Sequence, residues 1–323
     1  MDQDAVLVSE DCSFKGLRTV VLENSFLRVT VFPELGAKIY DLIYKPLKKN
    51  LLWHNPRIAP RKVPFGGRFD DAWCGGWDEI FPNDAASVVE GESYPDMGEI
   101  WPLEWDCTVT REAGSQPYDS ATLVTSTYSP ITPCKITRYL TLRKNESNIH
   151  LQYVLENVGY STVKFLWKLH PAFDINESCT IEIPAKTGIV DPRYRSLYSE
   201  SSYTYGWPNA IRSDGKRADL SRVPPPSDRT CSLHYVTDLE DGWFMLRNPK
   251  EKMDVKFTFP KDVLNSVWLF LAYGGWRSLY TAVIEPSTSY PYDLAQAIKE
   301  GRYSKLDPSQ KLTCNIEVEV SST

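Results

Sequence analysis

The hydrophobic and polar positions of this chain follow the two-residue period of β-strands over much of its length. In the segment 311–320 (KLTCNIEVEV), apolar side chains occupy every second position, which is the pattern of a strand with one buried face. Other short segments rich in Val, Ile, Thr and aromatic residues are bounded by Gly, Pro, Asn or Asp, which commonly flank strands. The pattern predicts strands within 17–24, 27–45, 106–113, 121–129, 134–158, 163–175, 179–190, 242–248, 253–260, 267–273, 279–286 and 311–320.

A helical pattern is convincing in one segment, 290–303 (YPYDLAQAIKEGRY). Asp293 is suited to the N-cap, Gly301 is suited to the C-terminal end, and the apolar residues between them share one face. Many strands with few helices favour a large sandwich of sheets. We therefore expect an all-β fold with one short C-terminal helix.

The connections between these segments carry signals of their own. Residues 145–148 (NESN) predict a hairpin turn, and the proline-rich stretch 222–229 (RVPPPSDR) predicts a loop. The polar stretch 194–219 predicts a long surface excursion. Neither an internal repeat nor a linker is evident, so we expect a single domain over 1–323.

Composition and charge narrow the function. The chain has 323 residues, 42% of them hydrophobic, and a net charge of −6, which disfavours nucleic acid as a partner because binding phosphates requires a basic face and argues weakly against anionic membranes. The longest apolar runs, such as 267–273, are shorter than the ~20 residues of a membrane span. The acidic start, 1–12, lacks the features of a secretion signal, so we expect a cytoplasmic protein. Seven scattered cysteines without a CxxC pair predict reduced thiols and no structural zinc.

His170 is the first candidate for chemistry. It lies in an apolar strand segment and directly precedes Pro171, so its backbone is held extended. A buried histidine that serves only packing is the simpler interpretation of such a residue taken alone.

The stretch 72–84 (AWCGGWDEIFPND) is the second candidate. Its paired glycines permit a tight turn or a close approach to a ligand. Asp78 and Glu79 are adjacent and would point to opposite faces of a strand, so one at most lines a pocket. Trp77 offers a face for stacking on a sugar, and Arg68 offers a hydroxyl donor. An ordinary turn with solvated acids and a surface ion pair is the alternative.

Two further stretches place carboxylates beside aromatic residues. In 96–105 (DMGEIWPLEW), Glu99 lies near Trp101; in 273–287 (YGGWRSLYTAVIEPS), Trp276 and Arg277 lie on a turn and the following strand delivers Glu285. Packing of the tryptophan residues and a solvated strand end are the simpler interpretations. Taken together, however, these stretches resemble motifs of a known family.

The sequence resembles the galactose mutarotase-like (aldose 1-epimerase) superfamily. The segments that carry the resemblance are 22–53, with its Gly-Ala-x-Ile turn, GGWDEIFPND (75–84), WKLHPAFDI (167–175) and the C-terminal glutamate segment 284–298. The resemblance implies a β-supersandwich whose concave sheet binds a monosaccharide or a sugar derivative. It maps the general acid onto His170 and the general base onto Glu285.

The resemblance implies an isomerase that interconverts the anomers of an aldose by opening its ring. A carboxylate is a suitable base and a protonated imidazole is a suitable acid near neutral pH. This chemistry needs neither a metal nor a redox cofactor, and the enzyme is expected to be a monomer or a homodimer. Trp77, Trp101 and Trp276 are candidates for stacking; Arg68, Asp78, Glu99, Lys168 and Arg277 are candidates for binding the sugar.

The chain departs from the family at one motif. Well-studied mutarotases carry His-Gly-x-x-Arg, whereas the matching stretch here begins at Met97 and ends at Trp101. This predicts an altered sugar, one with an acidic substituent bound by Arg68, Lys168 or Arg277. Two alternatives stay open: a carbohydrate-binding protein without catalysis, and a glycoside-cleaving enzyme that uses Glu99 with Glu285.

Overall fold

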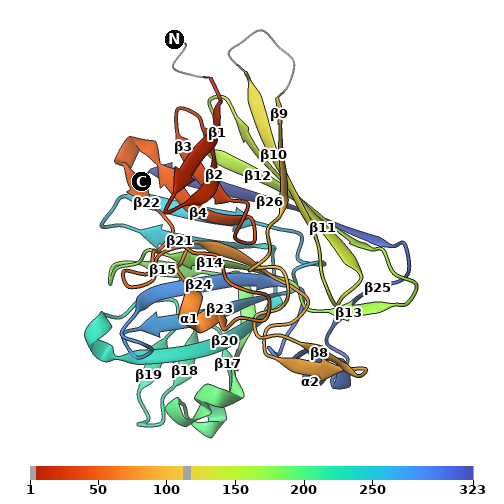
Figure 1. Cartoon of the computed structure of the whole chain (residues 1–323). Helices are drawn as coiled ribbons and strands as arrows, with labels where there is room; N and C mark the ends of the chain where they lie inside the picture. The colour runs from red at the N-terminus through yellow and green to blue at the C-terminus, as the bar shows by residue number, and fades with distance from the viewer. Residues whose placement is uncertain (1–4, 112–117, 323) are drawn as a thin grey trace.

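A computed structural model describes residues 5–111 and 118–322, and within them two large antiparallel sheets form the molecule (Figure 1). The larger sheet has the strand order β1-β2-β3-β4-β6-β14-β24-β23-β20-β16-β17, and β5 pairs with β4. Its strands are β1 (Leu7–Phe14), β2 (Leu17–Glu23), β3 (Leu27–Phe32), β4 (Lys38–Tyr44), β5 (Lys49–Asn50), β6 (Trp77–Ile80), β14 (Lys168–Phe173), β16 (Ala185–Val190), β17 (Thr204–Gly206), β20 (Thr230–Leu239), β23 (Ser266–Tyr273) and β24 (Tyr280–Ser287).

The smaller sheet has the order β15-β21-β22-β26-β12-β11-β10-β9. Its long strands cross the upper right of Figure 1. Its members are β9 (Asp106–Arg111), β10 (Ser120–Tyr128), β11 (Cys134–Arg143), β12 (Asn148–Asn157), β15 (Thr180–Glu182), β21 (Trp243–Asn248), β22 (Met253–Thr258) and β26 (Lys311–Ser322). Three two-stranded pieces join β7 (Ser87–Val89) to β8 (Glu92–Tyr94), β13 (Val163–Phe165) to β25 (Ser304–Leu306) and β18 (Asn209–Ile211) to β19 (Arg217–Asp219).

The all-β prediction is confirmed, as is the C-terminal helix. Helix α2 (Leu294–Lys299) begins after Asp293, whose side chain accepts a hydrogen bond from the backbone N–H of Gln296. The hairpin at 145–148 joins β11 to β12. The excursion at 194–219 contains short strands and 3₁₀ turns over Pro192–Leu197 and Glu200–Ser202; two further 3₁₀ turns cover Lys45–Leu47 and Pro226–Asp228.

Several details differ from the sequence analysis or lie beyond it. Strands β1 and β20 were not predicted, and the segments predicted as single strands over 163–175 and 179–190 each contain two strands, β13 and β14 in the first and β15 and β16 in the second. A one-turn helix, α1 (Phe69–Ala72), precedes the paired glycines; four residues are too few for a periodic pattern to reveal it. Positions 112–113 of the strand predicted over 106–113, and positions 1–4 of the acidic start, lie outside the described residues.

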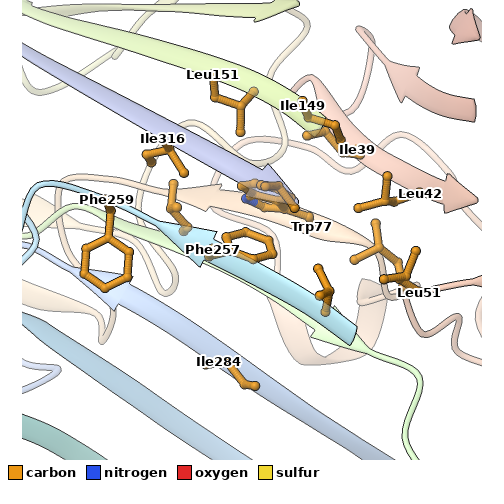
Figure 2. Packing of buried hydrophobic residues seen from close by; sticks show 14 of the residues in the cluster. Ile39, Leu42, Leu51, Trp77, Ile149, Leu151, Phe257, Phe259, Ile284 and Ile316 are labelled. Carbon is orange, nitrogen blue, oxygen red and sulfur yellow. The ribbon is translucent and has the colours of Figure 1, made fainter. Parts of the chain in front are cut away.

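The core fills the space between the two sheets (Figure 2). Trp77 of the larger sheet packs on Phe257 of the smaller one, with ring centroids 5.1 Å apart. Around this contact lie apolar side chains from both sheets, among them Ile39, Leu42, Ile149, Leu151, Ile284 and Ile316. One polar cluster interrupts this core: Arg138 of β11 and Glu79 of β6 form a buried ion pair at 3.2 Å, and the Tyr153 hydroxyl donates a 2.6 Å hydrogen bond to Glu79.

Strand alternation determines which side chains leave the core. On β14, Leu169 and Phe173 point between the sheets, so Lys168 and His170 point to the opposite face. On β24, Ile284 points inward and Glu285 points outward by the same rule. The outer face of the central strands of the larger sheet therefore collects charged and titratable groups.

Candidate active site

A small pocket opens on this outer face of the larger sheet. Its volume is about 150 Å³, which is the size of an engineered cavity that holds one benzene ring. It is lined by Phe69, Asp70, Trp73, Asp84, Asp96, Met97, Lys168, His170, Arg193, Tyr194, Leu233, Phe270, Trp276 and Glu285. Of the residues that the sequence singled out as site candidates, Lys168, His170, Trp276 and Glu285 are among them.

His170 and Glu285 face each other because their strands are neighbours in register. β14 and β24 pair with Lys168 opposite Ser287 and Ala172 opposite Val283, so His170 lies opposite Glu285. Nε2 of His170 is 4.0 Å from Oε2 of Glu285. Both side chains are at least 94% buried yet line the pocket.

Lys168 binds two acidic groups of the pocket. Its ammonium forms ion pairs with Glu285 of the neighbouring strand and with Asp84, which follows β6. It also lies over the Trp268 ring, 4.4 Å from the centroid. This lysine is 3% exposed, and a buried ammonium is stable only with such partners.

Aromatic rings form the walls of the pocket. Phe69 and Trp73 contact His170 edge to face, with centroids 5.5 and 5.8 Å from the imidazole. Trp276 adjoins both Trp73 and Phe270, at 6.0 and 5.4 Å. Flat apolar faces around a polar floor suit a sugar ring, which presents C–H groups on its faces and hydroxyls at its edge.

Burial shifts the pKa values of the two candidate proton-transfer residues in opposite directions. Desolvation raises the pKa of Glu285 to about 7, although the Lys168 ammonium opposes this change. Desolvation, together with the positive charges of Lys168 and Lys38, holds the pKa of His170 well below its usual value. Burial therefore favours the neutral form of the imidazole, whereas the sequence predicts a protonated one.

Trp77 and Asp78 were candidates for sugar binding and lie elsewhere. Trp77 is fully buried between the sheets, because its position on β6 alternates with that of Asp78. Asp78 lies on the same side of the sheet as His170, opposite it in the strand pair. Its carboxylate is buried and held by the Lys38 ammonium, and it does not line the pocket.

Glu99 and Trp101 are also outside the pocket. Glu99 is fully buried, and its two oxygens accept hydrogen bonds from the backbone of Ile131 and from the backbone and hydroxyl of Thr132. It therefore organises a loop, and the pairing of Glu99 with Glu285 required for glycoside cleavage is not present. Trp101 packs behind Phe69, with centroids 5.0 Å apart, so it supports the wall without lining it.

Arg68 and Arg277 point away from the pocket. The Arg68 side chain is 79% exposed and lies 3.4 Å from Asp71. Arg277 donates to the carboxylate of Asp71 at 2.9 Å and to the backbone carbonyl of Asp70. It thereby links the turn that carries Trp276 to α1, which carries Phe69 and is followed by Trp73. Neither arginine is in position to bind an acidic sugar substituent inside the pocket.

The sequence reasoning missed the residues that loops bring to the pocket mouth. Asp84 and Asp96 flank the β7–β8 hairpin, and Arg193 follows the buried Asp191, which binds its guanidinium at 2.8 Å. Asp84 closes the very motif that carried the resemblance, GGWDEIFPND, and that was the one available signal. Asp96 and Arg193 carry no pattern that distinguishes them from other loop charges.

Other features of the described residues do not compete with this pocket for chemistry. No three His, Cys, Asp or Glu side chains within 5–111 and 118–322 are arranged to hold a metal ion. A larger hollow of about 900 Å³ lies on the outer face of the smaller sheet, lined by residues such as His150, Gln152 and Glu317. Within the described ranges, no helix is both long and apolar enough to cross a membrane.

Comparison with known proteins supports the fold. No protein-family model matches this sequence, and neither does any curated protein sequence. A candidate aldose 1-epimerase from Klebsiella pneumoniae matches with a TM-score of 0.73 and 14% identity, over 98% of this chain and 83% of that one. A galactose mutarotase-like protein from Clostridium acetobutylicum matches with a TM-score of 0.65 and 10% identity, over 99% of both chains.

A third solved structure, the Slr1438 protein of Synechocystis, matches with a TM-score of 0.69 and 16% identity over 98% of this chain and its own full length. The expected resemblance is thus confirmed at the level of the fold: the chain has the galactose mutarotase-like β-sandwich. At 10–16% identity these likenesses do not extend to a substrate.

Proposed function

We propose that this chain interconverts the anomers of an aldose or a modified aldose by opening and closing the sugar ring, with His170 and Glu285 as the proton-transfer pair. The observation that carries the proposal is the pair itself. Two buried titratable side chains lie 4.0 Å apart on adjacent strands and line a pocket with aromatic walls and room for about one ring. Perturbed titratable pairs in clefts are typical of acid–base sites.

The chemistry requires one proton to leave the anomeric hydroxyl while another reaches the ring oxygen. Opening the ring allows the bond between C1 and C2 to rotate, and the reverse transfers close the ring as the other anomer. A pair that holds one proton can perform both transfers. The protonated member is the acid and the other is the base, and the roles exchange on closing because the reverse reaction follows the same path.

The electrostatics of the pocket bear on which member holds that proton. The raised pKa of Glu285 and the lowered pKa of His170 favour a protonated carboxyl beside a neutral imidazole. The resemblance instead assigns the acid to His170. The two assignments differ only in the position of one proton within the pair, so they predict the same number of protons in the active form.

A carbohydrate-binding protein without catalysis is the second candidate. Met97 lies in the pocket where the family motif has a histidine, and this observation favours that candidate. It predicts that sugar binding survives Glu285→Gln and that neither form of the protein accelerates anomer exchange.

Exchange NMR decides between the two candidates. Anomer interconversion rates would be measured for a panel of neutral, acidic and amino aldoses, with wild-type protein, Glu285→Gln and His170→Asn. The proposal expects acceleration for at least one aldose by the wild type and its loss in both variants. If no aldose in the panel is accelerated while one of them binds, the enzyme proposal is wrong and the binding protein is supported.

A further inference from the structure

The positive charges that reach the pocket already have partners in the protein. Lys168 is held by Asp84 and Glu285. Arg193 binds the fully buried carboxylate of Asp191 at 2.8 Å and lies over the Tyr292 ring, 3.5 Å from its centroid. An acidic ligand would have to compete with these contacts.

The carboxylates of the pocket are in excess over its cations. Asp70, Asp84, Asp96 and Glu285 line it, against Lys168 and Arg193. Within the described residues Asp96 makes neither an ion pair nor a side-chain hydrogen bond. Asp70 lies 3.9 Å from Arg277, which is closer to Asp71, at 2.9 Å. The mouth of the pocket therefore carries negative charge that the protein leaves uncompensated.

The state of Asp96 reflects this imbalance. Although Asp96 is exposed, desolvation by the surrounding protein, together with the negative charges of Asp84 and Asp70, raises its pKa to about 6, while Lys168 and Arg193 act in the opposite direction. Burial also raises the pKa of Asp70. A ligand that brings a positive charge to this point would relieve the repulsion between the carboxylates.

Two observations independent of the carboxylates point to a ligand here. Nδ1 of His170 has no hydrogen-bond partner within the described residues, although this pocket-lining side chain is only 5% exposed. Buried polar atoms are normally hydrogen-bonded. In addition, Phe69, Trp73, Phe270 and Trp276 offer aromatic rings, which attract both sugar faces and cations.

We propose that the sugar bound here is an amino aldose, whose protonated amino group lies at the pocket mouth among Asp70, Asp84 and Asp96 while its ring lies between the aromatic walls. This inference rests on the proposed function for its assignment of a sugar and replaces the acidic substituent expected from the sequence. Sugar hydroxyls then reach His170 and Glu285.

Binding of matched sugars tests the inference without any use of turnover. Calorimetry at pH 7 would compare glucose with 2-amino-2-deoxyglucose and 6-amino-6-deoxyglucose, which exchange one hydroxyl for an ammonium at nearly constant size. Glucuronate would represent acidic sugars. Because the mouth is partly solvated, we expect one of the amino sugars to bind about 5- to 10-fold more tightly than glucose, and glucuronate to bind more weakly than glucose.

Asp96→Asn removes the charge at constant shape and is expected to abolish that preference. Asp262→Asn, at an exposed position outside this pocket, removes the same charge and is expected to retain it. In the wild type the preference should also decline as the pH falls below about 6, where Asp96 takes up a proton beside Asp70, Asp84, Lys168 and Arg193. This readout does not depend on the folding of a variant.

The outcomes separate this inference from the proposed function. Equal or weaker binding of both amino sugars relative to glucose, or tighter binding of glucuronate, overturns the inference even if neutral aldoses are anomerised. A preference for an amino sugar without accelerated anomer exchange supports the inference and counts against the enzyme proposal.

Discussion

Glu79 and Glu285 are two buried glutamates with the same perturbation and different surroundings. Each is 1% exposed, and desolvation raises the pKa of each to about 7. Each also has a cationic partner, Arg138 for Glu79 and Lys168 for Glu285. Glu79 points between the sheets, whereas Glu285 points to the opposite side of the larger sheet and meets the pocket.

A perturbed pKa does not by itself identify a functional site. Glu79 is bound through Oε1 by Arg138 and by the Tyr153 hydroxyl, its Oε2 has no hydrogen-bond partner within the described residues, and it points between the sheets. Glu285 lines the pocket, where its Oε2 pairs with Lys168 and lies 4.0 Å from the imidazole of His170. Access to a pocket and an imidazole neighbour there, together with the pKa, distinguish the functional candidate from the structural one.

The difference between the two glutamates is tested most directly by making the same substitution at both. Glu285→Gln should lower kcat/KM for anomer exchange by about 10²- to 10⁴-fold, because it removes one member of the proton-transfer pair. Glu79→Gln should leave kcat/KM of the folded protein unchanged within about twofold, since a single conservative change outside the pocket alters no contact with the sugar. Exchange NMR measures both; similar losses would contradict the assignment of Glu285.

The next largest effect concerns stability. Arg138→Met leaves Glu79 buried without its cation and should lower the free energy of unfolding by about 3–5 kcal/mol. The loss should be greater at pH 8 than at pH 6, because a protonated Glu79 needs the cation less. Urea unfolding at the two pH values provides the measurement.

Arg143→Met is the matched control on the same strand. Its guanidinium is 53% exposed and lies 3.8 Å from Glu146, so its removal should cost less than about 1 kcal/mol. An Arg138→Met variant as stable as this control would show that the core ion pair does not support the fold.

The pH dependence of the reaction gives a smaller, graded effect. Activity requires one proton on the pair of His170 and Glu285. Since the pKa of Glu285 is raised to about 7, kcat/KM should fall as the pH rises through 7, by about tenfold for each further unit. Glu79→Gln should keep this profile although the pKa of Glu79 is similar. Activity that increases through pH 7 would be inconsistent with a shared proton.

The smallest expected effect is on sugar binding at the wall. Trp276→Ala should raise KM by about 2- to 12-fold, with less change in kcat, because an aromatic contact contributes about 0.5–1.5 kcal/mol. Trp243→Ala, on β21 outside the pocket, should leave KM as it is. Equal KM values for the two variants would remove Trp276 from the binding site.

The sequence predicted the sandwich and its helix because both depend on short-range patterns. Segments with alternating apolar and polar residues, such as 311–320, indicate strands, and Asp293 caps α2 as its position suggested. His170 and Glu285 emerged from motifs at strand ends, and the structure brings them together. Their roles in catalysis remain a proposal.

The other predictions depended on features that no local sequence pattern carries. Successive side chains of a strand point to opposite faces of the sheet. Pairing with strands that are distant in sequence therefore decides whether Trp77 faces the core or the pocket. Glu99 was a plausible site carboxylate until the loop at Ile131 and Thr132 supplied its donors. Asp96 and Arg193 reach the pocket through loops, whose paths follow from the packing of the whole molecule.

The pairing of β14 with β24 affects when the candidate site can form during synthesis and folding. The two strands that place His170 opposite Glu285 are separated in sequence by β15 to β23, and contacts between such distant segments form slowly. During synthesis the carboxyl partner is still missing when the imidazole has already been made. The proposed function therefore predicts that chains ending before β24 do not bind sugar, and that recovery of sugar binding during refolding follows the pairing of β24 with β14.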